Sequence, residues 1–371
     1  MVPAVLVSEV FPPAVGGSGL LLEQVYGRLD GVPVTVLASG IRPALAQGPG
    51  RLPVTRVDMS APDWGIVRPA ALRRHVRVAR AIRAAAPGDA VVHCARALPE
   101  GLSARLAGTR RRLPYVCWTH GEELGFASTS RELTRLMRYV YRHAAAVVAN
   151  SRNTARLLEN WGVTPERITV VYPGVDSSRF HPGVEASALR QSLARPGEVV
   201  FLSVGRLQRR KGHDLVLAAL ARLAGGDQPI RYVIAGDGPE RERLEAQAAS
   251  LGVSDRVCFQ GAVDTRDLPA YYAASDVFVM PNRAEGVDFE GFGIVFLEAA
   301  ASGRPAIGGR TGGVPEAIEE NVTGLLVSGT DAGELADAMQ RLARSPELRR
   351  QYGAAGRTRA CEQFSWERSA A

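Results

Sequence analysis

The chain almost lacks lysine. Of its 45 basic residues 44 are arginine, and the one lysine, Lys211, lies in the stretch 204–212. GC-rich coding produces such a bias. Lysine carries a compact point charge with rotatable donors, whereas arginine carries a rigid planar fork. A position that keeps lysine against this bias therefore indicates a need for the compact ammonium; the alternative is chance survival on a solvated helix start.

Cysteine and long apolar runs are also scarce. The four cysteines, at 94, 117, 258 and 361, form no CxxC pair, so we expect buried free thiols and no zinc site. No apolar run approaches the roughly 18 to 20 residues that span a bilayer. The N-terminus carries no basic segment with a cleavage site, which argues against a signal peptide. Together these absences predict a cytoplasmic protein.

Short apolar, β-branched runs alternate with helical patterns along the whole chain. The expected strands are 2–7, 34–37, 90–94, 115–119, 147–150, 168–172, 199–204, 232–235, 257–260, 277–280 and 306–308. Continuous apolar strands separated by helices are typical of parallel sheets that helices cover on both faces. A chain of 371 residues is too long for one ordinary core. We therefore predict an α/β fold with two doubly wound, Rossmann-like domains.

Proline and glycine cluster between the two series of strands, at 172–176, 180–183 and 195–197, and such clusters mark turns and linkers. We place the N-terminal domain at residues 1–180 and the C-terminal domain at 181–371, with the final helix from about residue 356 expected to cross back. Ser151, an N-cap residue type, predicts a helix to Trp161. Since open α/β sheets bind ligands outside the carboxyl ends of their strands, we expect a ligand in a cleft between two facing domains.

The positive charge lies in the first half of the chain. Residues 1–180 hold 23 basic and 13 acidic residues, a net +10, whereas residues 181–371 hold 22 basic and 25 acidic residues, a net −3. The densest stretches are 68–83, with basic and apolar residues at helical spacing, and the triplet 110–112. An acidic substrate or an anionic membrane surface would complement this half. The alternative is a solvated amphipathic helix, and nucleic acid is not expected because no basic–aromatic platform is present.

Three glycine-containing segments follow predicted strands. The first, 11–19, contains Gly16 and Gly17, where the absence of side chains lets the backbone approach a phosphate. The second places Arg206 and Lys211 after the strand 199–204, and two cations there suit a diphosphate. The third, 236–240, is explained fully by turn chemistry and carries no functional prediction.

The most specific motif is EGFGIVFLE, which runs from Glu290 to Glu298. One glutamate lies on a loop and the other lies one to two turns into a predicted helix, so each carboxylate can accept hydrogen bonds from vicinal hydroxyls. The glycines between them leave main-chain N–H groups facing an anion at the helix N-terminus. One carboxylate for each diol, with a phosphate between them, matches a nucleotide sugar; the alternative is two surface glutamates.

Taken together, these motifs resemble those of the retaining glycosyltransferases of family 4, which have the two-domain GT-B fold. The resemblance covers nearly the whole chain, including the segments 312–316 and 364–366. Within the family, the segment 282–298 is similar to the GDP-mannose-dependent enzymes that mannosylate phosphatidylinositol lipids. The resemblance implies a retaining hexosyltransferase with GDP-mannose as the favoured donor and a hydroxyl acceptor on a lipid or glycan. It implies no metal and no other cofactor, and no Asp-x-Asp sequence is present.

The resemblance also implies roles for the residues around the leaving diphosphate. Arg206 and Lys211 would neutralise its charge, and Gly16 and Gly17 would present backbone N–H groups to it. The widely favoured mechanism of the family is attack on the face that the diphosphate leaves, with the leaving phosphate accepting the acceptor's proton. No residue pair in the chain has the pattern of a nucleophile with its base.

On the sugar side, the resemblance assigns the ribose hydroxyls to Glu298 and hydroxyls of the transferred sugar to Glu290. His120, at a strand end, matches a family histidine that contacts the donor sugar; the alternative is a structural histidine. Three backbone amides would support the sugar and phosphate: those of Phe292, Gly293 and Ile294. Nothing assigns the acids that follow, Glu122 and Glu123.

Other functions stay open at this point. One is a UDP-sugar-dependent transferase that acts on a soluble small molecule. Another is a sugar-nucleotide epimerase, hydrolase or phosphorylase of the same fold, and a third is a non-catalytic nucleotide-sugar binder. The motifs do not determine the base, the sugar, the acceptor or the oligomeric state. A lipid acceptor would add peripheral attachment at the inner face of the membrane.

Overall fold

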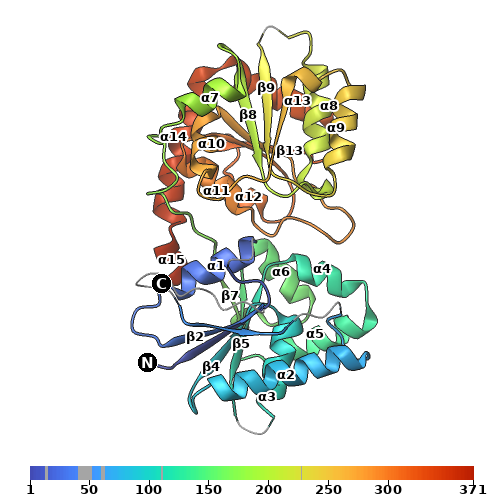
Figure 1. The fold of residues 1–371 in the computed structure, drawn as a ribbon, viewed down its shortest axis with the longest axis vertical. Coiled ribbons are helices and arrows are strands. Elements are labelled where there is room, and N and C mark those ends of the chain that lie inside the picture. The colour runs from blue at the N-terminus through green and yellow to red at the C-terminus, as the bar shows by residue number, and fades with distance from the viewer. Residues whose placement is uncertain (13–15, 41–51, 60–62, 110–111, 227) are drawn as a thin grey trace. The chain divides into compact units, whose positions relative to one another are not determined.

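The structure is a computed structural model that describes residues 1–12, 16–40, 52–59, 63–109, 112–226 and 228–371 (Figure 1). It divides into two compact units. The first unit contains Met1–Pro173 and Trp366–Ala371, and the second contains Gly174–Ser365. The sequence places this boundary after residue 180 and the return from about residue 356. In the structure the chain passes from one unit to the other after Pro173 and again after Ser365. The segments next to these two positions are paired, because the Val175 amide donates to the Phe364 carbonyl oxygen (2.8 Å).

The first unit is built on a parallel sheet with the strand order β3-β2-β1-β4-β5-β6-β7 among the described residues. The strands are β1 Ala4–Ser8, β2 Val34–Ser39, β3 Val54–Val57, β4 Val91–Cys94, β5 Tyr115–Thr119, β6 Ala146–Ala149 and β7 Ile168–Val170. The helices are α1 Gly17–Tyr26, α2 Pro69–Ala85, α3 Leu102–Ala107, α4 Glu122–Ser128, α5 Arg131–His143, α6 Arg152–Asn160 and α15 Trp366–Ala370, with the short turns η1 Ala97–Gly101 and η2 Pro165–Arg167.

The second unit repeats this design with the order β10-β9-β8-β11-β12-β13, again among the described residues. Its strands are β8 Val199–Val204, β9 Ile230–Ala235, β10 Val257–Gly261, β11 Val277–Met280, β12 Ala306–Gly309 and β13 Gly324–Val327. Its helices are α7 Ser187–Leu193, α8 His213–Arg222, α9 Arg241–Ser250, α10 Leu268–Ala274, α11 Ile294–Ala301, α12 Val314–Ala317, α13 Ala332–Arg344 and α14 Pro346–Gln363, with the turns η3 Arg209–Lys211 and η4 Ser254–Arg256.

The apolar runs of the sequence become the central strands. β1, β8 and β11 are buried along their whole length, as expected for parallel strands covered on both faces. The predicted cap is also confirmed, because the Ser151 hydroxyl oxygen accepts from the Thr154 amide at the start of α6. Two strands that the sequence does not predict, β3 and β13, are short runs of four residues at the outer edges of the two sheets. The predicted α/β architecture with two doubly wound sheets is confirmed.

Candidate active site

In each sheet the strand order reverses once, and this reversal sets where a ligand can bind. Chain connections run outward in one direction from β1 and in the other from β4 in the first unit, and the same holds for β8 and β11 in the second. The crevice at such a switch point, outside the carboxyl ends of the strands, is the usual ligand site of an open α/β sheet. In the second unit, Arg206 and Lys211 follow β8, whereas Glu290 and Glu298 follow β11. All four predicted donor-binding residues therefore lie on segments that follow the two strands of this switch point.

Lys211 and Glu290 form an ion pair at this switch point. The Lys211 ammonium lies 2.5 Å from Glu290 Oε2, and the Arg210 guanidinium donates to the same oxygen at 2.8 Å. The Asn282 amide nitrogen donates to it as well, at 3.2 Å. The side chains of Lys211 and Glu290 are only 11% and 13% exposed. The structure thus joins a cation that the sequence assigns to the diphosphate with a carboxylate that it assigns to the sugar.

The charge of Glu290 depends on these two cations. Burial by itself raises the pKa of a carboxyl group, because the charged form loses hydration. Here the positive charges of Lys211 and Arg210, together with their hydrogen bonds, outweigh burial and hold the pKa of Glu290 below its usual range. The buried carboxylate is therefore ionised at neutral pH. An ionised carboxylate accepts hydrogen bonds from hydroxyl groups on both of its oxygens.

The two loops that carry this cluster touch through their backbones. Gly212 adopts φ 75°, and a Cβ there would lie 2.3 Å from the Pro281 carbonyl oxygen, so only glycine fits. The Arg283 amide also donates to the Arg210 carbonyl oxygen (2.9 Å). This contact fixes the turn after β8 against the segment after β11, which is what positions Lys211 beside Glu290.

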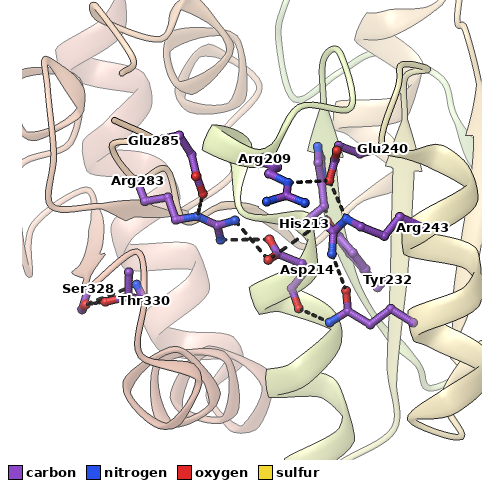
Figure 2. A network of polar contacts seen from close by, with 11 residues as sticks. Arg209, His213, Asp214, Tyr232, Glu240, Arg243, Arg283, Glu285, Ser328 and Thr330 are labelled. Carbon is purple, nitrogen blue, oxygen red and sulfur yellow. Dashed lines mark hydrogen bonds and ion pairs between the residues drawn. The ribbon is translucent and has the colours of Figure 1, made fainter. Parts of the chain in front are cut away.

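A network of ion pairs stabilises the segments that follow β8 and β11 (Figure 2). Arg283 makes a bidentate pair with Asp214 at the start of α8, with both nitrogen–oxygen distances near 3 Å (2.9 and 3.0 Å). Its Nε donates to Glu285 at 2.5 Å. Arg209, in the turn η3, instead faces Glu240 on the opposite side, at 3.6 Å. The neighbours Arg209 and Arg210 therefore contact different segments.

The helix α11 begins inside the EGFGIVFLE motif. Gly293 precedes it with φ 91°, and the first turn leaves amides without partners inside the helix, as every helix N-terminus does. The Phe292 side chain is buried against Phe364 (ring centroids 5.8 Å apart), so only its backbone could face a ligand. The amides of Gly293 and Ile294 lie at the same helix start, where the helix dipole favours an anion.

Glu298 lies within α11, apart from the Lys211–Glu290 pair. Its Oε2 accepts a hydrogen bond from the Tyr272 hydroxyl group on α10 (2.7 Å). Burial raises the pKa of Glu298 more than the Tyr272 hydrogen bond and the charge of Arg179 lower it, and Glu298 forms no ion pair with the described residues. The pKa values of the motif's two glutamates are thus shifted in opposite directions. Tyr272, which the sequence does not single out, fixes the orientation of the second one.

The remaining predicted cation, Arg206, differs from Lys211. It lies just after β8, is exposed, and makes no ion pair with any described residue. A guanidinium in water keeps its hydration until an anion arrives, whereas Lys211 already has a carboxylate partner. The structure therefore does not bring Arg206 into the cluster of Lys211, Arg210 and Glu290.

In the first unit, the predicted glycine loop follows β1, which borders the switch point of that sheet. Residues 13–15 of this loop lie outside the described residues. Gly17 is the first residue of α1 and Gly16 precedes it, so their amides belong to a helix N-terminus. Phosphate binding by these two amides stays a prediction, since a helix N-terminus is a general anion-binding feature.

His120 follows β5 in the same unit and is buried. Burial lowers its pKa to about 4, so the ring is neutral at pH 7. Its Nε2 lies 3.1 Å from the Ala95 carbonyl oxygen, which can only accept, so Nε2 carries the proton. Nδ1 makes no hydrogen bond within the described residues and would accept one from a ligand hydroxyl. Glu123 has a structural role, because its carboxylate accepts from the His120 amide (2.8 Å).

A charged cluster that the sequence motifs did not predict lies at the switch point of the first unit. Arg96, just after β4, donates to Glu9 Oε2 (2.7 Å) and Glu100 Oε1 (3.3 Å). The Glu9 amide donates to the same Glu100 oxygen (2.8 Å), and the Arg96 guanidinium lies 5.0 Å from the centre of the Trp64 ring. The sequence signal for this cluster is a charged residue soon after each of two adjacent strands, Glu9 after β1 and Arg96 after β4.

The basic helix predicted over 68–83 is α2, and one of its arginines is not on the surface. Arg74 is 2% exposed and contacts His75, so it cannot contribute to a basic surface. Arg73, Arg77 and Arg80 are exposed. Several apolar side chains are exposed beside them, namely Ile66, Val67, Leu72 and Val76. The other basic triplet, at 110–112, lies mostly outside the described residues.

The described residues contain neither a cluster of metal ligands nor a membrane-spanning helix. Within them, no group of three or more His, Cys, Asp or Glu side chains is arranged to hold a metal ion. No helix among them combines the length and the apolar character needed to cross a membrane.

Comparison with solved structures shows the fold. The crystal structure of Anabaena HepE, in complex with UDP and glucose, superimposes with a TM-score of 0.81 at 22% identity, over 100% of this chain and 97% of that one. Sucrose-phosphate synthase from Thermosynechococcus elongatus gives a TM-score of 0.80 at 24% identity, over 99% and 96%. Both likenesses extend over the full chain and support the GT-B fold.

Comparison of sequences shows the family. A family model described as Glycosyltransferase Family 4 matches residues 24–179, and one described as Glycosyl transferases group 1 matches residues 185–359. The GDP-mannose-dependent alpha-(1-6)-phosphatidylinositol monomannoside mannosyltransferase of Mycobacterium tuberculosis is 39% identical over 273 residues, which cover 72% of this chain and 69% of that protein. The D-inositol 3-phosphate glycosyltransferase of Geodermatophilus obscurus is 38% identical over 240 residues, covering 62% and 51%. The chain therefore belongs to glycosyltransferase family 4 and is a retaining hexosyltransferase that uses a nucleotide sugar.

Proposed function

We propose that this enzyme transfers mannose from GDP-mannose to a hydroxyl group of an inositol-containing phospholipid, with retention at the anomeric carbon. The observation that carries the proposal is the 39% identity, over 273 residues, to the mycobacterial enzyme whose name states that donor and acceptor class. The exposed apolar and basic side chains of α2 support a lipid acceptor, because together they suit an anionic membrane surface.

In the proposed reaction the bond between the anomeric carbon and the diphosphate breaks while the acceptor oxygen forms its bond on the same face. The acceptor's proton passes to an oxygen of the leaving diphosphate, which departs as GDP. Lys211 and Arg206 would stabilise the charge that develops on that diphosphate, together with the amides at the start of α11 and of α1. Glu290 would hold hydroxyl groups of the mannose and Glu298 those of the ribose. His120, which is neutral, would accept a hydrogen bond from a sugar hydroxyl.

One relative favours a second acceptor. The Geodermatophilus obscurus protein, at 38% identity over 240 residues, is named for D-inositol 3-phosphate, a soluble acceptor. It matches less of this chain than the mycobacterial enzyme does, 62% against 72%. For that reason we place the lipid acceptor first.

The donor and the acceptor can be tested separately. A thermal-shift screen with GDP, UDP and ADP identifies the base, because a ligand at 100 times its Kd stabilises the folded state by about 2.7 kcal/mol. Transfer is then measured from GDP-mannose and UDP-glucose to phosphatidylinositol, to a phosphatidylinositol mannoside and to inositol 3-phosphate. Selective stabilisation by GDP with mannosylation of a lipid supports the proposal. Stabilisation by UDP alone, or transfer to inositol 3-phosphate alone, contradicts it.

A further inference from the structure

We infer that Arg210, which lies outside the family motifs described above, is a positioning residue that holds Glu290 in place while Lys211 engages the donor diphosphate. This inference rests on the proposed function of Lys211 and Glu290. It adds a third residue to the pair and separates the roles of two adjacent cations.

The contacts of Arg210 differ from those of Lys211. The Arg210 guanidinium uses two nitrogen atoms for two acids: Nη1 lies 2.8 Å from Glu290 and Nε lies 3.2 Å from Asp288. Its backbone oxygen accepts from the Arg283 amide, so main chain and side chain are both tied to the segment after β11. At 12% exposure, the guanidinium is anchored between these acids. Lys211 has one ion-pair partner, Glu290, among the described residues, and a lysine stem has more rotational freedom.

Donor binding makes a second cation necessary. If the Lys211 ammonium turns to the diphosphate, Glu290 loses a partner while it remains in a buried site. A buried carboxylate without a cation either becomes protonated or destabilises the site that holds it. Among the described residues, the charged and polar groups that contact the Glu290 carboxylate are Lys211, Arg210 and Asn282, and Asn282 carries no charge. Arg210 therefore keeps the carboxylate ionised and oriented toward the sugar hydroxyls once Lys211 has turned.

This division predicts that substitutions of Arg210 and of Lys211 impair different steps of donor binding. Removal of the Arg210 charge affects only what depends on Glu290, which is the sugar portion of the donor. Binding of a nucleoside diphosphate without a sugar depends on Lys211 and should not change. An arginine at position 210 reaches two acids with a planar fork, so lysine at this position replaces it only in part.

The experiment compares Arg210→Gln and Arg210→Lys with Arg209→Gln, a matched control. Arg209 is the preceding residue, is 61% exposed and faces Glu240. Donor turnover is measured as kcat and KM across pH, and binding of GDP alone is measured by thermal shift. For Arg210→Gln we expect kcat to fall roughly tenfold or more, and the acid limb of the kcat/KM profile to move to higher pH. We expect GDP binding to stay within about twofold of wild type, and a smaller loss in Arg210→Lys.

Other outcomes overturn the inference. The first is an acid limb of the kcat/KM profile that does not move in Arg210→Gln. The second is a loss of GDP binding in Arg210→Gln as large as the loss of kcat, which would place Arg210 on the diphosphate. The third is a loss of kcat in Arg209→Gln as large as that in Arg210→Gln. Retained GDP binding also shows that the variant is folded. Wild-type protein that turns over no nucleotide sugar would overturn the proposed function itself, and the inference with it.

Discussion

Lys211 shows, at the scale of one residue, why a compact ammonium differs from a guanidinium. It lies 2.5 Å from Glu290, and under the proposed function it must turn from this carboxylate to the leaving diphosphate. We expect Lys211→Ala to lose roughly 2 to 4 kcal/mol of transition-state stabilisation, as when one strong electrostatic donor is removed. We also expect Lys211→Arg to be impaired, because the planar fork fits differently between Arg210 and Glu290. Steady-state kcat/KM measures both; an arginine variant equal to wild type would show that charge alone suffices.

Substitutions of the two glutamates of the motif should change different kinetic quantities. Glu290→Ala should lower kcat more than it weakens donor binding, because Glu290 is assigned to the reacting sugar. Glu298→Ala should mainly weaken binding of the nucleoside diphosphate. Tyr272→Phe should weaken it as well, by about 1 kcal/mol, because it removes one hydrogen bond to Glu298 (2.7 Å) without changing shape.

Calorimetric titration with GDP and steady-state kinetics distinguish these effects. Small and equal effects of the two alanine substitutions would remove the motif from the active site. A Tyr272→Phe variant with wild-type affinity for GDP would show that Glu298 keeps its orientation without this hydrogen bond.

At the scale of an element, we expect α2 to bind an anionic membrane surface, because its exposed face carries several arginines. Attraction to an anionic surface is worth about 1 kcal/mol for each nearby basic residue and is screened within roughly 10 Å at 0.1 M salt. We expect sedimentation with anionic liposomes at low salt, loss of it at high salt, and a reduction when Arg73, Arg77 and Arg80 are changed to Gln. These three are exposed, whereas Arg74 is buried and its substitution should lower stability instead.

A matched triple substitution in the second unit controls for net charge. Arg266, Arg344 and Arg350 are exposed and are changed to Gln together. Equal loss of liposome binding in both triple variants would mean that α2 has no special role. No binding at low salt would point to a soluble acceptor.

At the scale of the whole molecule, buried histidines should make stability depend on pH. Burial lowers the pKa of His93 and His120 to about 4 and that of His213 to about 3. Between these values and the ordinary histidine pKa of about 6.5, the unfolded chain binds more protons than the folded one. Stability should therefore be complete above about pH 6.5 and fall toward pH 4, by up to about 1.4 kcal/mol per pH unit for each histidine.

His93→Gln tests this dependence against His143→Gln, since His143 is exposed. The difference between melting temperatures at pH 7.5 and 5.5 should shrink in the first variant only. Burial raises the pKa of Glu123 and of Glu298, but both titrate in every variant, so the comparison isolates the histidine. An unchanged difference in His93→Gln would show that this histidine does not contribute.

The alternation of apolar strands with helices was sufficient to predict two doubly wound parallel sheets, because a strand buried on both faces is apolar throughout. The motifs along the chain, among them Arg206, Lys211, Glu290 and Glu298, were together sufficient to predict family membership through their resemblance to family 4, although none would suffice alone. The short edge strands β3 and β13 were not predicted, although strands of equal length in the interior of the sheets were.

Only the tertiary structure decided which residues act together. Arg210 and Arg209 are adjacent arginines in the sequence, yet one contacts Glu290 and the other Glu240. Arg74 carries the same charge as Arg73 but is buried, because helical rotation places it on the inner face of α2. Tyr272 and Arg96 gain their roles from residues 26 and 87 positions away, Glu298 and Glu9. Local patterns fix elements through short-range geometry, whereas partners across strands and helices depend on how the sheet brings distant segments together.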